Sequence, residues 1–94
     1  MSEAWSFPAP PEAPVVTQRG VAFLDRPVLV AIHDAEGDWW LLHEEEGRDQ
    51  AHVSSAGALL RRDPDLAALA DLPRGWRAER PAPGEPWARS ELPG

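Results

Sequence analysis

Two apolar runs separated by a short polar stretch stand in the middle of the chain. Residues 28–33 read Val-Leu-Val-Ala-Ile-His, residues 38–43 read Asp-Trp-Trp-Leu-Leu-His, and Asp-Ala-Glu-Gly lies between them. β-Branched and aromatic residues are typical of strands, and Gly37 can adopt the positive φ angle that a tight connection requires. The pattern therefore predicts a central β-hairpin over about 28–43.

A four-residue loop would fix the register of this hairpin, with His33 opposite Asp38 and Ile32 opposite Trp39. Side chains alternate between the two faces of a strand, so this register divides the hairpin into two sets. The first set is Val28, Val30, Ile32, Trp39 and Leu41, and the second is Leu29, Ala31, His33, Asp38, Trp40 and Leu42. Both sets are largely apolar. One face must therefore meet helices, while the other is either covered by the terminal arms or is an interaction surface.

Helix signals follow in the second half of the chain. A serine pair can cap a helix over about 56–62, and Asp63 followed by Pro64 is typical of the start of a second helix over about 64–71. The apolar residues of this second helix recur at helical spacing; they are Leu66, Leu69 and Leu72. A Leu-Pro-Arg-Gly turn then ends the helix, and Trp76 opens a closing strand.

Shorter signals complete the predicted fold. Residues 15–16 and 51–53 indicate short strands, and prolines concentrate near both ends of the chain. Their distribution predicts an extended Pro-rich arm over 1–13 and a Pro/Gly-rich tail over 81–94. The sequence thus predicts a single α+β domain over 14–80, in which a small antiparallel or mixed sheet with a central hairpin packs on two short helices.

The composition restricts the classes of function. The chain has 94 residues, 43% of them hydrophobic, enough for one small domain, and no cysteine for disulfides or thiolate metal sites. Its formal net charge is −7, and all nine basic residues are Arg. This acidity argues against nucleic-acid binding and against adsorption to an anionic membrane, and it suits a basic protein partner. Neither a membrane-length apolar run nor a signal-peptide pattern is seen, so we expect a cytoplasmic protein.

Carboxylates and histidines invite a metal or catalytic interpretation, which their arrangement argues against. The predicted register puts His33 and His43 on opposite faces and at opposite ends of the hairpin. Asp34, Glu36 and Asp38 alternate in the turn without the glycine position and the distant bidentate Glu of a calcium loop. We therefore expect no bound metal.

A nucleophilic site receives no better support. Ser54 and Ser55 lie near His52, but no glycine-framed nucleophile turn surrounds them. A domain of this size also has little room for a substrate pocket of several hundred cubic ångströms. We therefore expect neither a cofactor nor enzymatic activity.

The order of several short motifs resembles a known group of bacterial proteins. The acidic turn at 33–39, the Arg-Asp-Pro-Asp-Leu run at 62–66 and the Leu-Pro-Arg-Gly-Trp-Arg-Ala-Glu-Arg run at 72–80 are similar to the domain described as a predicted immunity protein of bacterial polymorphic toxin systems. The resemblance covers about 15–87. It implies a small α+β domain and protein binding, and it carries no catalytic residue set. Trp40 departs from it, because this position is more often polar.

Acidic and aromatic residues are the candidate partner-binding positions: Trp40, Glu44, Glu45, Glu46, Asp49, Trp5 and Trp87. An acidic loop speeds association with a basic surface, and an adjacent Trp suits a buried anchor, whereas Trp39 and Trp76 are expected in the core. We expect a non-enzymatic protein-binding domain. The more specific hypothesis is an immunity-type inhibitor that occludes a toxin. The alternative is an accessory subunit tied into a larger assembly by the tryptophans of its arms. An open apolar face would also favour a homodimer.

Overall fold

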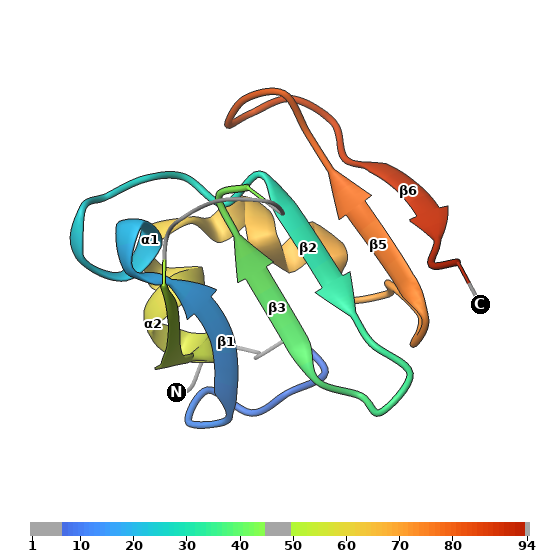
Figure 1. The fold of residues 1–94 in the computed structure, drawn as a ribbon, viewed down its shortest axis with the longest axis horizontal. Coiled ribbons are helices and arrows are strands. Elements are labelled where there is room, and N and C mark those ends of the chain that lie inside the picture. Colours follow the sequence, from blue (N-terminus) through green and yellow to red (C-terminus); the bar gives the residue numbers. More distant parts are fainter. Residues whose placement is uncertain (1–6, 45–49, 94) are drawn as a thin grey trace, which may run out of the picture.

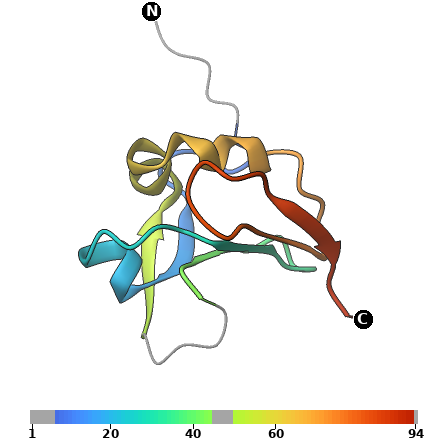
Figure 2. The same ribbon diagram turned by 90° about the horizontal axis from the view of Figure 1, so that it is seen from above.

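The computed structural model describes residues 7–44 and 50–93, which form a six-stranded sheet with helices packed along it (Figures 1 and 2). The strands are β1 (Pro14–Gln18), β2 (Val30–His33), β3 (Trp39–Leu42), β4 (Ala51–Ser55), β5 (Trp76–Glu79) and β6 (Ala88–Glu91). The helices are α1 (Arg19–Phe23), α2 (Ala56–Arg62) and the 3₁₀-helix η1 (Pro64–Leu69). The predicted α+β class and the central hairpin, which is β2–β3, are confirmed.

The strands lie in the order β4-β1-β3-β2-β5-β6. β1 and β3 are parallel, and the other neighbouring pairs are antiparallel, so the sheet is mixed. Strand β6 lies within the tail over 81–94 and was not predicted from the sequence. It pairs with β5 over its whole length and forms one edge of the sheet, while β4 forms the other.

The register of the central hairpin differs by one residue from the prediction. His33 lies opposite Trp39, and Ile32 lies opposite Trp40. The loop therefore spans residues 34–38, one residue more than expected. A shift of one residue exchanges the faces of one strand relative to the other. The predicted grouping of Ile32 with Trp39 is therefore wrong, because Ile32 shares its face with Trp40.

The side chain of Asp34 explains the longer loop. Its Oδ1 accepts hydrogen bonds from the backbone N–H of Glu36 (3.0 Å) and of Asp38 (2.9 Å). The backbone N–H of Asp34 also donates to the Asp38 carbonyl at 3.0 Å, which closes the loop next to the last strand pair, His33–Trp39. Gly37 has a φ of +93°, as the turn prediction required. This local bonding of a carboxylate to its own turn draws one more residue out of the strand.

The hydrophobic core lies between α2, η1 and the face of the sheet that they cover, called the inner face here (Figure 2). The inner face contributes Val15, Ala31, Trp39, Leu41 and Ala78, and the helical side contributes Ala56, Leu59, Leu66, Leu69 and Leu72. Phe7 is also buried, with its ring centroid 4.7 Å from that of Trp39. The described part of the predicted N-terminal arm thus packs on the domain. Trp39 is in the core as predicted, and Trp76 packs partly buried against it.

The two predicted helices begin where their caps indicated. Ser55 Oγ accepts a hydrogen bond from the backbone N–H of Ala58 (3.2 Å), and the Asp63 side chain caps η1 at Asp65. The second segment is a 3₁₀-helix that ends at Leu69, although an α-helix to residue 71 was predicted. Leu66 and Leu69 are three residues apart, and side chains three apart lie above one another in a 3₁₀-helix, so both reach the core. Leu72, in the turn after η1, is also buried.

Candidate protein-binding surface

The other face of the sheet, called the outer face here, carries apolar side chains that cross four strands in one line. Val53 of β4 lies opposite Val16 of β1, Val16 is paired with Trp40 of β3, and Trp40 lies opposite Ile32 of β2. Residues directly opposite each other project from the same face of a sheet. Val53 is 63% exposed and Trp40 36%, while Val16 and Ile32 are half-buried. These four residues are called the outer row.

The outer row has a defined extent. Val30 and Leu42 lie on the same face, two residues along β2 and β3 from Ile32 and Trp40, and both are buried. The accessible apolar area therefore does not extend along these strands toward Val30 and Leu42. Across the sheet, the line continues from Ile32 to Arg77 of β5 and then to Ser90 of β6. The line is therefore apolar from β4 to β2 and polar on β5 and β6. Such a border between an apolar centre and a polar rim is typical of protein interfaces.

Trp40, in the middle of the outer row, is held in place by Asp34. The indole Nε1–H donates to Asp34 Oδ2 at 3.0 Å, and the other carboxylate oxygen is fixed by the turn. The hydrogen bond from Trp40, together with those from the backbone N–H groups of the turn, lowers the pKa of Asp34 below its ordinary value. Asp34 is therefore charged at neutral pH and orients an accessible indole that would otherwise rotate.

Carboxylates surround Trp40 at both ends of its strand. Asp34, Glu36 and Asp38 lie in the turn before β3, and Glu44 follows β3 on its other side, exposed to solvent. The backbone of Glu44 is fixed by the buried Gln18 side chain, whose Nε2 donates to the Glu44 carbonyl at 2.8 Å. Of the other predicted acidic residues, Glu45, Glu46 and Asp49 lie outside the described residues. The predicted arm residue Trp5 also lies outside them.

Trp87, the remaining predicted partner-binding residue, does not join the outer row. The guanidinium of Arg80 lies over its ring at 4.3 Å from the centroid, a cation–π contact within the domain. Trp87 also lines a shallow groove with Pro64 and Ala68 of η1, on the helical side of the sheet. The Trp87 side chain is therefore engaged in contacts within the domain. Among the described tryptophans, Trp40 is the one that is exposed on the outer face.

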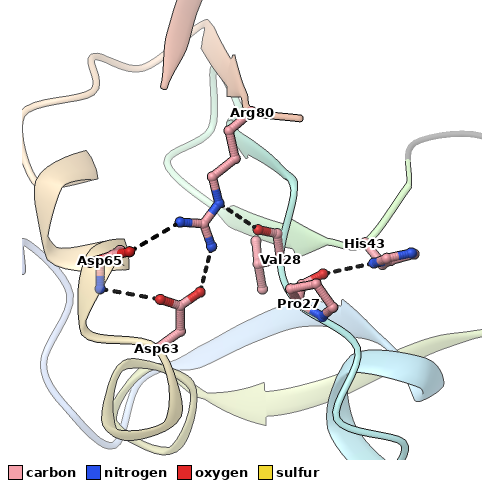
Figure 3. Close-up of polar contacts among 6 residues, drawn as sticks. All are labelled: Pro27, Val28, His43, Asp63, Asp65 and Arg80. Carbon is pink, nitrogen blue, oxygen red and sulfur yellow. Dashed lines mark hydrogen bonds and ion pairs between the residues drawn. The ribbon is translucent and has the colours of Figure 1, made fainter. Parts of the chain in front are cut away.

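Arg80 is the centre of a buried polar cluster that links β5 to the start of η1 (Figure 3). Its fully buried side chain donates through Nε to the Val28 carbonyl (3.1 Å) and forms ion pairs with Asp63 (2.6 Å) and Asp65 (3.5 Å). A buried charge is tolerated only when it is paired and hydrogen-bonded. The cluster meets this condition through groups of the chain itself, so we assign it to the stability of the fold.

Each of the three histidines has its own partner within the chain. His33 Nδ1–H donates to the Leu72 carbonyl (2.8 Å) and its ring stacks on Trp39, while His43 Nδ1–H donates to the Pro27 carbonyl (2.8 Å, Figure 3). His52 packs edge-on against Phe23. Across residues 7–44 and 50–93, no three His, Asp or Glu residues gather closely enough to hold a metal ion.

A second groove, of about 310 Å³, lies between α1 and α2 and is lined in part by Val21, Leu59 and Pro83. Two of its charged residues, Asp25 and Arg62, form an ion pair at 2.7 Å, and Arg62 also donates to the Val21 carbonyl. These contacts join the ends of the two helices. We therefore assign Asp25 and Arg62 to the link between α1 and α2.

Comparison with protein-family models, with curated proteins and with solved structures finds no match for this chain. The resemblance to immunity proteins therefore stays a prediction. In the described part of the chain, no helix combines the length and the apolar character needed to cross a bilayer.

Sequence reasoning found Trp40 but missed most of the outer row. Val16 and Val53 were recognised as strand residues, yet their neighbours in the sheet lie far away along the chain. Ile32 was placed on the other face by the shifted register. Asp34 was recognised as a turn residue, and the diagonal between Asp34 and Trp40 across the hairpin could have been found only with the correct loop length.

Proposed function

We propose that this chain is a non-enzymatic protein-binding domain that docks its partner on the outer row. The observation that carries the proposal is the state of Trp40, which is accessible on a sheet face and held by Asp34. Tryptophans are frequent energetic centres of protein interfaces, and orienting one before binding reduces the entropy lost on association. Val16, Ile32 and Val53 supply the surrounding apolar contact.

The partner should combine an apolar patch with basic residues around it. The turn at 34–38 and Glu44 provide carboxylates on both sides of Trp40, and the whole chain carries a net charge of −7. Charges at the rim of an interface mainly raise the association rate and select the partner, while the apolar centre gives affinity. This division of roles fits an exposed Trp between two acidic segments.

In its sharper form, the proposal is an immunity-type protein that blocks a bacterial toxin by covering it. The resemblance of the motifs at 33–39, 62–66 and 72–80 supports this form, as does the acidic surface. The mechanism is steric and electrostatic. The alternative, an accessory subunit anchored by Trp5 and Trp87 of its arms, has less support at Trp87, because this indole is engaged by Arg80 within the domain.

The test is a capture experiment with the tagged chain in host lysate at low and high salt, comparing wild type with Trp40→Ala. Leu24→Ala is the matched control, because Leu24 is 65% exposed and lies outside the outer row. We expect one stoichiometric partner that is lost in Trp40→Ala, is retained in Leu24→Ala, and leaves as salt rises. Equal capture by wild type and Trp40→Ala would contradict the proposal, as would the absence of any partner.

A further inference from the structure

Strand β6 is an open edge of the sheet. All four of its residues are exposed, and Figure 1 shows no described element beyond it. The other edge, β4, is different, because α1 packs near it and Phe23 of α1 contacts the ring of His52 edge-on. An open edge presents main-chain N–H and C=O groups that can pair with another strand. β6 is therefore the more accessible place for such pairing.

The hydrogen bonds of β6 identify which of its main-chain groups point outward. Leu92 N–H donates to the Gly75 carbonyl at 2.7 Å, one position beyond the pair Trp76–Glu91. Opposite residues in an antiparallel ladder alternate between hydrogen-bonded and non-hydrogen-bonded pairs. By this alternation Ser90 and Ala88 bond to β5. The main-chain groups of Arg89 and Glu91 then face away from the sheet.

The charges of these two residues select one way for β6 to pair with itself. An antiparallel partner strand must align outward groups with outward groups, so Arg89 or Glu91 must lie opposite Arg89 or Glu91 of the second strand. Alignments that place Arg89 opposite Arg89, or Glu91 opposite Glu91, bring like charges together and are destabilising. The alignment that places Arg89 opposite Glu91 brings opposite charges together at both positions. It is also symmetric, because the two Ser90 residues lie opposite each other with the two-fold axis between them.

We propose that β6 is a self-association edge, and that two copies of this chain pair their β6 strands in the antiparallel register Arg89–Glu91. Each of the two Arg89–Glu91 pairs exchanges two main-chain hydrogen bonds and adds an ion pair. Arg89 already binds Asp71 and the Ala68 carbonyl, and its guanidinium has further N–H donors for a carboxylate of the second copy. The interface is small, so the dimer is weak and reversible.

The inference is independent of the proposed function, but the two have a joint consequence. Ser90 is the last residue of the line that starts at Val53 and contains the outer row. Pairing at Ser90 continues this line into the second copy and forms one extended sheet. The two Trp40 residues would lie on the same side of that sheet, about seven strand spacings or ~34 Å apart.

Sedimentation velocity with the whole chain, from about 10 µM to 1 mM, tests the inference in the concentration range where small interfaces associate. About 0.15 M salt reduces the repulsion of the net charge, because the Debye length is then about 8 Å. Glu91→Arg would place Arg opposite Arg, and Arg89→Glu would place Glu opposite Glu. We expect the wild type to dimerise and each variant alone to do so at least about tenfold more weakly.

Mixing the two variants provides the decisive control. A chain with Glu91→Arg and a chain with Arg89→Glu restore both opposite-charge pairs between them, so the mixture should form a heterodimer about as strong as the wild-type dimer. Circular dichroism of each variant verifies folding, and Glu91→Pro removes an outward N–H without touching the bonds to β5. A wild type that is monomeric at 1 mM overturns the inference. So does a dimer that Glu91→Arg and Glu91→Pro leave unchanged, or a mixture that does not recover association.

Discussion

Asp34 and Trp40 lie diagonally across the β2–β3 hairpin, and the indole Nε1–H of Trp40 donates to Asp34 Oδ2 at 3.0 Å. The second oxygen of the same carboxylate accepts from the backbone N–H groups of Glu36 and Asp38. One side chain therefore defines the loop and orients the accessible indole. This link connects the local chemistry of a turn to the geometry of the outer row.

Removing this link should loosen Trp40 without unfolding the domain. Asp34→Ala deletes three exposed hydrogen bonds, and we expect a loss of about 1–2 kcal/mol in the free energy of unfolding. Partner affinity should fall as well, because Trp40 would have to be ordered on binding. Urea unfolding and the NMR line of the Trp40 indole N–H measure the two effects. Glu36→Ala, in the same turn, is the control and should leave the indole signal in place.

The same link should respond to acid. Hydrogen bonds lower the pKa of Asp34 in the folded state, so the charged carboxylate stabilises the fold at pH values above its unfolded pKa of about 3.9. This contribution is lost as the pH falls through the lower pKa of the folded state. The Trp40 indole N–H shift should therefore titrate with a midpoint below 3.9. Asp34→Asn should abolish that titration; a midpoint above 3.9 in the wild type would contradict the assignment.

Arg80 should be the charged residue to which stability is most sensitive. Arg80→Ala leaves Asp63 without its partner and removes the cation from the Trp87 ring, so we expect a loss of about 2–4 kcal/mol. Arg80→Lys keeps the charge but lacks the planar guanidinium, so its free energy of unfolding should lie between those of the wild type and Arg80→Ala. Denaturant unfolding measures the series. Arg61→Ala, an exposed Arg on α2, should change stability by less than about 0.5 kcal/mol. Equal losses of unfolding free energy in Arg61→Ala and Arg80→Ala would contradict the prediction that the buried cluster around Arg80 stabilises the fold.

Gly57 should resist replacement even though it lies in a helix. Its backbone N–H donates to the Pro11 carbonyl at 2.8 Å, and a Cβ atom added at Gly57 would lie 3.0 Å from the same oxygen. Alanine favours helix by about 1 kcal/mol over glycine, yet it would push the segment around Pro11 away from α2. We expect Gly57→Ala to lower the melting temperature and to increase proteolysis before Val15. A higher melting temperature for Gly57→Ala would contradict this prediction, because the segment around Pro11 would then accommodate the added Cβ atom without a loss of stability.

Local signals predicted most elements of this fold. The serine cap of α2, the Asp63–Pro64 start of η1 and the glycine of the hairpin loop each act within a few residues, and each was correct. The hairpin register was wrong, because two backbone bonds to the Asp34 side chain lengthen the loop by one residue. Alternation of apolar residues cannot reveal this when both faces of a hairpin are apolar.

Pairing between distant segments was beyond sequence reasoning. β6 has the sequence Ala-Arg-Ser-Glu, with no apolar alternation, and it is a strand because it pairs with β5. The outer row depends on β1 lying between β3 and β4, an order that no local pattern encodes. Trp40 was therefore identified as a candidate, but its neighbours Val16 and Val53 were not.

The central place of β1 has a consequence for the kinetics of folding. The hairpins β2–β3 and β5–β6 join neighbouring segments, and hairpins form in about 1–10 µs. β1 must instead pair with β3 and β4, which follow it far along the chain. Contacts of high sequence separation are slow because a long loop must close before they stabilise anything. We therefore expect insertion of β1 to limit the refolding rate. Val15→Ala should slow refolding in a stopped-flow chevron, whereas Arg89→Ala on β6 should mainly speed unfolding.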